Sequence, residues 1–149
     1  MRRLLALLCA WLCLLCSSGC STPRPAPVWV SGDVAAASER VAWEATRLAL
    51  EKNNFPVGAG LDPAHMLAVS GWRQSLAPFR GKGFRERCHI RYERKSAGVY
   101  TVNLRVERER NDDIVKPLDL TYAEWKSEPD NPERARIVLQ YIRSLLTPP

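Results

Sequence analysis

Cysteine and histidine are scarce in the part of this sequence that follows position 20. Of five cysteines only Cys88 lies beyond that point, so no internal disulfide is expected there and the core must stabilise the fold. Cys88 falls in phase with apolar neighbours, which favours a buried structural cysteine over the alternative, a reactive thiol. The two histidines, His65 and His89, have no carboxylate or cysteine at metal-ligand spacing. We therefore expect neither a metal site nor another cofactor.

The one marked hydrophobic run is too short to cross a membrane. Arg2 and Arg3 precede thirteen uncharged, mostly apolar residues, Leu4 to Cys16. A helix of this length spans ~20 Å, whereas the hydrocarbon core of a bilayer is ~30 Å thick. The run therefore fits the core of an export signal better than a permanent transmembrane helix.

Small residues and a cysteine follow this run, in the order Ser17-Ser18-Gly19-Cys20. The segment resembles the signal of bacterial lipoproteins, whose lipobox ends in a small residue and the cysteine that is lipidated, although Ser17 stands where that family usually has leucine. The resemblance implies a signal peptide over residues 1–19 and a lipid, including palmitate, on Cys20. Ordinary secretion with cleavage beside Gly19 and a retained signal anchor are the alternatives. A lipoprotein would lie in the cell envelope and face the periplasm, and Ser21 in place of aspartate favours the outer membrane.

The segment after Cys20 contains three prolines between Ser21 and Pro27 and has no apolar periodicity. Such a segment favours an extended, polyproline-like conformation. We expect residues 20–27 to form a tether that holds the protein on the order of 20 Å from the membrane, at ~3.1 Å per residue. Residues 28–149 have the size of one domain.

Hydrophobic periodicity predicts helices at the two ends of this domain and strands between them. An apolar stripe predicts a first helix from about Asp33 to Asn53, capped by Ser31 or Asp33. Asn131, Pro132 and Glu133 predict the start of a second helix. The expected buried positions are Val34, Ala37, Val41, Ala45, Leu48 and Ala49 in the first helix and Ile137, Val138, Tyr141, Ile142 and Leu145 in the second.

Strict alternation between the helices predicts an antiparallel hairpin of residues 84–94 and 99–110. Two shorter strands are expected within residues 55–60 and 66–72, and residues 114–125 show no settled period. The predicted fold class is α+β, a two-layer sandwich in which two helices cover one face of an antiparallel sheet of about four strands, in the order α-β-β-β-β-α.

The predicted arrangement is similar to small envelope lipoproteins that serve as accessory subunits of outer-membrane assembly machineries. It is also similar to bacterial lipoproteins that combine an Arg-rich hairpin, a tryptophan and a capped terminal helix. The residues that carry this likeness are Arg87 to Arg94, Val99 to Val106, Trp125, and Asp130-Asn131-Pro132-Glu133. The likeness bears on architecture and not on activity.

Residues that catalysis would need are few. Ser70 and Cys88 have no identifiable base and orienting acid, and Gly81-Lys82-Gly83 lacks the flanking pattern of a phosphate-binding loop. Glu107 and Glu109 share one face of a strand, but the surrounding Arg105, Arg108 and Arg110 favour a solvated lattice of salt bridges over a catalytic pair. We therefore do not expect an enzyme.

Positive charge is concentrated between positions 73 and 110, where eleven basic side chains accompany four acidic ones. Alternation places Arg85, Arg87, His89 and Arg91 on the face opposite the core. We predict a lipid-anchored, non-enzymatic binding or scaffold module whose partner is another envelope protein, not nucleic acid. The alternative is direct binding of anionic lipid or glycan through Arg85, Arg87 and Arg91, because the arginine fork pairs with carboxylate and phosphate. A solvated face balanced by glutamates would bind neither.

Overall fold

Two long antiparallel strands form the centre of the molecule. They are β5 (Phe84–Ser96) and β6 (Val99–Asn111), each of 13 residues, and they confirm the predicted hairpin. Gly98 in the connecting turn has a φ of 70°, a left-handed conformation that glycine adopts without steric cost. The computed structural model describes residues 24–58, 60–76 and 83–147.

Shorter strands extend the sheet along both edges of this hairpin. On the β6 edge, β1 (Val30–Ala35) and β7 (Trp125–Glu128) pair with successive parts of β6. On the β5 edge, β3 (Leu67–Val69) and β4 (Arg73–Ser75) pair with β5, and β2 (Leu61–Asp62) pairs with β3. Within the described ranges the sheet is antiparallel and has seven strands, more than the four that the sequence predicts.

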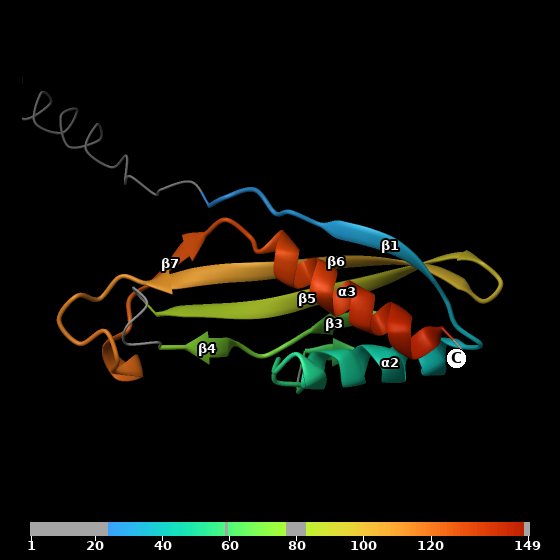
Figure 1. Cartoon of the computed structure of the whole chain (residues 1–149), viewed down its shortest axis with the longest axis horizontal. Coiled ribbons are helices and arrows are strands. Elements are labelled where there is room, and N and C mark those ends of the chain that lie inside the picture. Colours follow the sequence, from blue (N-terminus) through green and yellow to red (C-terminus); the bar gives the residue numbers. More distant parts are fainter. Residues whose placement is uncertain (1–23, 59, 77–82, 148–149) are drawn as a thin grey trace, which may run out of the picture.

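Two helices lie over one face of this sheet (Figure 1). They are α2 (Glu39–Lys52) and α3 (Pro132–Leu146), which pack against each other, and α3 also contacts β6 and β1. A short 3-10 helix, η1 (Leu120–Tyr122), lies in the connection between β6 and β7. The fold is therefore α+β, as predicted. The largest fully buried apolar side chains are Phe55, Leu50, Leu104, Ile142, Val102, Val106 and Val138.

The first element is a strand and not the predicted helix. Residues 30–35 pair with β6, with Val34 opposite Tyr100, and α2 begins only at Glu39. Ser38 caps it, because its hydroxyl accepts a hydrogen bond from the backbone N–H of Val41 at 3.3 Å. The predicted order is thus wrong at its start. The period-2 alternation of Val30 and Val34, which is too short to stand out in the sequence, places both side chains on the core face of the sheet.

The predicted buried stripes of both helices are partly wrong. Val41 and Leu48 are 45% and 37% exposed, and Ile137 and Leu145 are 49% and 40% exposed. The buried side chains of α2 include the small residues Ala42 and Ala49, which let this helix approach the sheet closely, together with Leu50. In α3 the predicted Val138 and Ile142 are fully buried.

The start of the terminal helix is as predicted. The side chain of Asn131 accepts a hydrogen bond from the backbone N–H of Arg134 at 3.0 Å, and Pro132 occupies the first helical position. The predicted strand over residues 55–60 is not present in its described part, whereas residues 66–72 contain β3. Phe55 is buried against the core nevertheless.

Candidate functional site on the open face of the sheet

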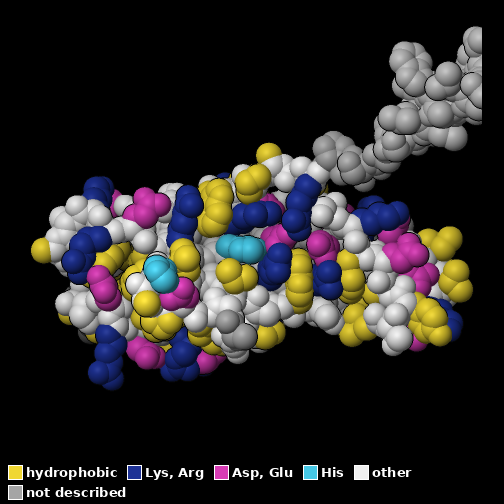
Figure 2. All heavy atoms as spheres, turned by 180° about the vertical axis from the view of Figure 1, so that it is seen from behind, with side chains coloured by type: hydrophobic (Ala, Val, Ile, Leu, Met, Phe, Trp, Pro, Cys, Tyr) yellow, Lys and Arg dark blue, Asp and Glu magenta, His cyan; other side chains and the backbone are white. Residues whose placement is uncertain are grey.

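The sheet face away from the helices, here called the open face, carries the predicted row of basic residues. Along β5 the side chains of Cys88 and Ile90 enter the core, so Arg85, Arg87 and Arg91 project from the other side, with 23%, 33% and 48% of their side chains exposed. Figure 2 shows this face, where basic, acidic and hydrophobic side chains are interleaved along the strands. The predicted lipidation site, Cys20, lies outside the described residues.

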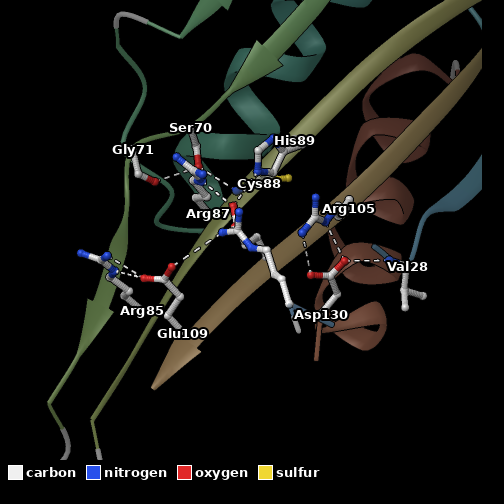
Figure 3. Close-up of polar contacts among 12 residues, drawn as sticks. Val28, Ser70, Gly71, Arg85, Arg87, Cys88, His89, Arg105, Glu109 and Asp130 are labelled. Atoms are coloured by element: carbon white, nitrogen blue, oxygen red, sulfur yellow. Dashed lines mark hydrogen bonds and ion pairs between the residues drawn. The ribbon is translucent and has the colours of Figure 1, made fainter. Parts of the chain in front are cut away.

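Two of these arginines are paired with glutamates directly across the hairpin. Arg85 is opposite Glu109, and its Nε lies 2.7 Å from the Oε2 of that carboxylate. Arg87 is opposite Glu107, with 2.6 Å between Nε and Oε2 (Figure 3 draws both arginines). Because each charge meets its opposite, the basic row is neutralised over much of its length.

His89 joins this network beside Glu107. Its Nε2 lies 3.0 Å from the Oε2 of Glu107. Burial lowers the pKa of His89 below its ordinary value, and Arg87 and Arg105 act in the same direction, although Glu107 opposes them. Burial alone would raise the pKa of Glu107, but hydrogen bonds from Arg87 and His89, together with the positive charges of Arg87 and Arg24, hold that pKa below its ordinary value. At neutral pH the site therefore holds an ionised glutamate and an uncharged imidazole.

Tryptophan side chains stack on the same arginines. The guanidinium carbon of Arg85 lies 4.4 Å from the ring centroid of Trp72 and 4.6 Å from that of Trp125, so this arginine is held between two indoles. Arg87 also stacks on Trp72, at 4.6 Å, and Arg91 stacks on Trp29, at 4.7 Å. Stacking and ion pairing together hold these long side chains in place. We call this set the Arg–Trp lattice: Arg85, Arg87, Arg91, Trp29, Trp72 and Trp125.

The lattice was not predicted from the sequence, because its tryptophans come from separate parts of the chain. Trp29 precedes β1, Trp72 precedes β4, and Trp125 begins β7. No local period connects them, since only strand pairing brings β4 and β7 beside the hairpin. The one available signal was the number of tryptophans in a chain of this length.

The described part of the predicted tether contacts the edge of the open face. The Arg24 guanidinium pairs with Glu107 and lies 3.8 Å from Glu109. The backbone N–H of Val28 donates to Asp130 at 2.7 Å, and Arg105 binds the same carboxylate through two nitrogens, at 2.6 and 3.2 Å (Figure 3). The N-terminal segment is therefore in contact with the sheet from Arg24 onward.

The predicted partners of the two glutamates need correction. Arg108 and Arg110 lie on the other face of β6, where they pair with Glu128, and Arg105 pairs with Asp130. Neither glutamate is solvated as expected, since Glu107 and Glu109 are only 3% and 9% exposed. The error arose because neighbours along a strand alternate between faces, whereas the true partners lie across the hairpin.

The nucleophile candidates have structural roles in the described part of the chain. Cys88 is fully buried, as the sequence predicts, and burial raises the pKa of its thiol. The hydroxyl of Ser70 accepts a hydrogen bond from the backbone N–H of Cys88 and donates one to the carbonyl of Gly71 (Figure 3). Within the described residues, neither Cys88 nor Ser70 forms a side-chain hydrogen bond with a histidine. Gly81-Lys82 lies outside the described residues.

Residues 24–58, 60–76 and 83–147 contain no group of three or more histidine, cysteine, aspartate or glutamate side chains that could hold an ion. His65 pairs with Asp62 at 2.7 Å on an exposed turn, a contact that the sequence analysis did not identify. None of the helices in the described ranges combines the length and hydrophobicity needed to span a bilayer.

Comparison with known proteins adds no assignment. No protein-family model matches the chain, and no curated protein matches it.

Proposed function

We propose that this protein is a lipid-anchored component of the cell envelope whose domain binds another envelope protein without catalysing a reaction. The observation that carries the proposal is the Arg–Trp lattice. Its arginines are held by stacking and by ion pairs, and its tryptophans are partly exposed or half-buried. Tryptophan and arginine are the side chains most enriched at the centres of protein interfaces.

Rigid side chains favour such an interface. A long arginine side chain that is ordered before binding loses little rotamer entropy when a partner docks on it. The planar guanidinium and the indole both offer flat, amphipathic surfaces that a protein can cover. The lattice is therefore prepared for contact before any partner arrives.

The alternative partner, an anionic lipid or glycan, receives less support from the charges. Glu109 and Glu107 already take up the pairing capacity of Arg85 and Arg87. An anion would have to displace these buried carboxylates, which would leave them unpaired. Of the three arginines, Arg91 has the weakest ion pair: it lies 3.7 Å from Glu93, and its side chain is 48% exposed.

The anchor rests on the sequence from Arg2 to Cys20, and one substitution tests it. Cys20→Ala should abolish acylation and leave an uncleaved precursor or a protein in the soluble fraction. Mass spectrometry of the N-terminal peptide and membrane fractionation provide the measurements. Normal processing and unchanged membrane association of Cys20→Ala would refute the lipid anchor.

Site-specific photocrosslinking of the full-length protein in cells tests the binding face. A photoreactive residue at Gln74 or Ser127, which are opposite Arg85 and Glu109 in the strand register, should crosslink to a protein. Gln140, exposed on α3, is the matched position on the helix layer and should not. Equal crosslinking from both layers would refute the assignment of the interface to the open face.

Vesicle binding separates the two functions. Phosphatidylglycerol vesicles and lipopolysaccharide are mixed with the soluble part of the protein, residues 24–149, which lacks the apolar run Leu4 to Cys16, with and without the combined changes Arg85→Ser, Arg87→Ser and Arg91→Ser. We expect no binding that responds to salt or to the triple change. Binding that is lost at high salt and in the triple variant would establish the anion-binding alternative, because exposed charges are screened within ~8 Å at physiological ionic strength.

A further inference from the structure

The connection between β6 and β7 displays a group of apolar side chains to solvent. We call residues 112–124 the apolar loop. Its exposed hydrophobic members are Ile114 at 80%, Val115 at 81%, Leu118 at 54%, Leu120 at 47% and Tyr122 at 53%. Hydrophobic side chains gather at the corresponding end of the molecule in Figure 2, the end where β6 and β7 meet in Figure 1. Such a concentration of exposed apolar groups marks a contact with a partner or a membrane.

Polar side chains within the loop, and that of Asn111 at the end of β6, accept hydrogen bonds from the loop backbone. The side-chain oxygen of Asn111 accepts hydrogen bonds from the backbone N–H groups of Asp113 and Glu124, at 3.0 and 3.1 Å. Asp113 accepts from Val115 at 2.7 Å, and Asp119 accepts from Thr121 at 3.0 Å. These bonds satisfy backbone donors within the loop, which lowers the cost of moving its tip out of water.

The loop emerges at the end of the molecule to which the predicted lipid is tied. Arg24 pairs with Glu107 and lies 3.8 Å from Glu109, and Cys20 is only four residues before it. Four residues reach at most ~14 Å. The loop begins three residues beyond Glu109, ~10 Å along β6. The turn at Gly98 is at the opposite end of the hairpin, more than ~30 Å from Glu109.

We infer that the apolar loop is a second membrane contact, in which the side chains from Ile114 to Tyr122 enter the interface of the bilayer that holds the lipid on Cys20. This inference rests on the proposed lipid anchor. Because Arg24 contacts the sheet, a lipid on Cys20 would be joined to this end of the domain by only four residues, which would hold it close to the membrane. Tyr122 and Lys116, whose Nζ lies 3.8 Å from the tyrosine ring centroid, are residue types that favour the interfacial region.

Charge on the loop indicates the kind of lipid. Four acidic residues, Asp112, Asp113, Asp119 and Glu124, outnumber the one basic residue of the loop, Lys116, so anionic headgroups would not attract the loop. Burial of apolar surface must then supply the affinity, and a zwitterionic bilayer is sufficient. The contact should accordingly resist salt.

Fluorescent labelling of the lipidated full-length protein tests the inference. Val115→Cys introduces an exposed thiol, whereas Cys88 is fully buried and the sulfur of Cys20 is acylated in the proposed protein. The variant is labelled with an environment-sensitive dye and reconstituted in phosphatidylcholine vesicles that carry nitroxide lipids. Ala97→Cys, an exposed position in the turn beside Gly98, is the matched control.

The label at position 115 should show blue-shifted emission and lose most of its intensity to the nitroxide lipids, at low and at high salt. The label at position 97 should remain in water and keep its intensity. If the protein is lipidated but its label at position 115 stays in water, the membrane contact of the loop is overturned and the proposed anchor is not. The same holds for a blue shift that appears only in native membranes and not in pure lipid, since it would indicate a protein partner. A protein without acyl groups on Cys20 would overturn the proposed anchor, and this inference with it.

Discussion

Glu86 interrupts the alternation of its strand because it is a charged residue on the core face. It is 1% exposed, and its carboxylate binds Arg73 at 2.5 Å and the amide of Asn131 at 2.8 Å. Asn131 is also the cap of α3. This one carboxylate therefore connects β5, β4 and the start of the terminal helix, and its charge compensates a half-buried arginine.

Removal of this charge should destabilise the fold. Glu86→Gln leaves Arg73 without its counterion, and we expect the free energy of unfolding in urea to fall by about 2 kcal/mol, less than for a fully buried pair because Arg73 is 25% exposed. The matched control is Glu93→Gln, because the side chain of Glu93 is 63% exposed. This control should change the free energy of unfolding by at most ~0.5 kcal/mol. Similar losses in both variants would contradict the role assigned to Glu86.

His89 should make stability depend on pH. Its pKa in the fold lies below the ordinary value of 6.5, so the unfolded chain binds a proton that the folded chain resists. Unfolding therefore becomes easier as pH falls below about 6.5. The free energy of unfolding, measured between pH 7.5 and 5, should decline less steeply in His89→Gln than in the unchanged protein. An equally steep decline in both would place the titrating group elsewhere.

At the scale of elements, the two faces of the β5–β6 hairpin are both well buried, but by different means. Leu104 and Val102 are fully covered by the helix layer, whereas Glu107 on the open face is covered by its own ion pairs and by Arg24. Arg87→Asp should therefore destabilise the fold more than the same change at an exposed arginine without a partner. It would place a second carboxylate beside Glu107.

Cavity formation under the helix layer tests this arrangement. Leu104→Ala should lower the free energy of unfolding by about 3 kcal/mol, because the side chain is fully buried. Thr101→Ala lies on the same strand and the opposite face, where it removes one exposed hydrogen bond to Asp33, and should cost at most ~1 kcal/mol. The reverse order of these two losses in urea unfolding would mean that the faces are assigned wrongly.

At the scale of the molecule, the helix layer and the open face share the β5–β6 hairpin. Tryptophans report on both: Trp72 and Trp125 belong to the Arg–Trp lattice, and Trp43 on α2 packs against the core. If residues 28–149 form one cooperative domain, tryptophan fluorescence and far-ultraviolet circular dichroism should give the same urea midpoint. Two separated transitions would show that the layers unfold independently.

Local patterns were sufficient for much of this architecture. The alternation along residues 84–94 and 99–110 depends only on the sequence within each strand, and so does the Asn131-Pro132 start of α3. Both signals act between near neighbours, through side-chain direction and through capping of free backbone groups. The α+β class followed from them.

Contacts between distant segments were decided by tertiary structure alone. The sequence identified Arg85 and Arg87 as open-face residues, but strand register determines that Glu109 and Glu107 neutralise them. It also determines that β4 and β7 bring two tryptophans onto Arg85. Sequence patterns cannot specify such pairs, because a partner across a sheet is set by the global alignment of strands and not by spacing along the chain. The same reason explains why the strand β1 was mistaken for part of a helix: its pairing partner, β6, lies about seventy residues away in the sequence.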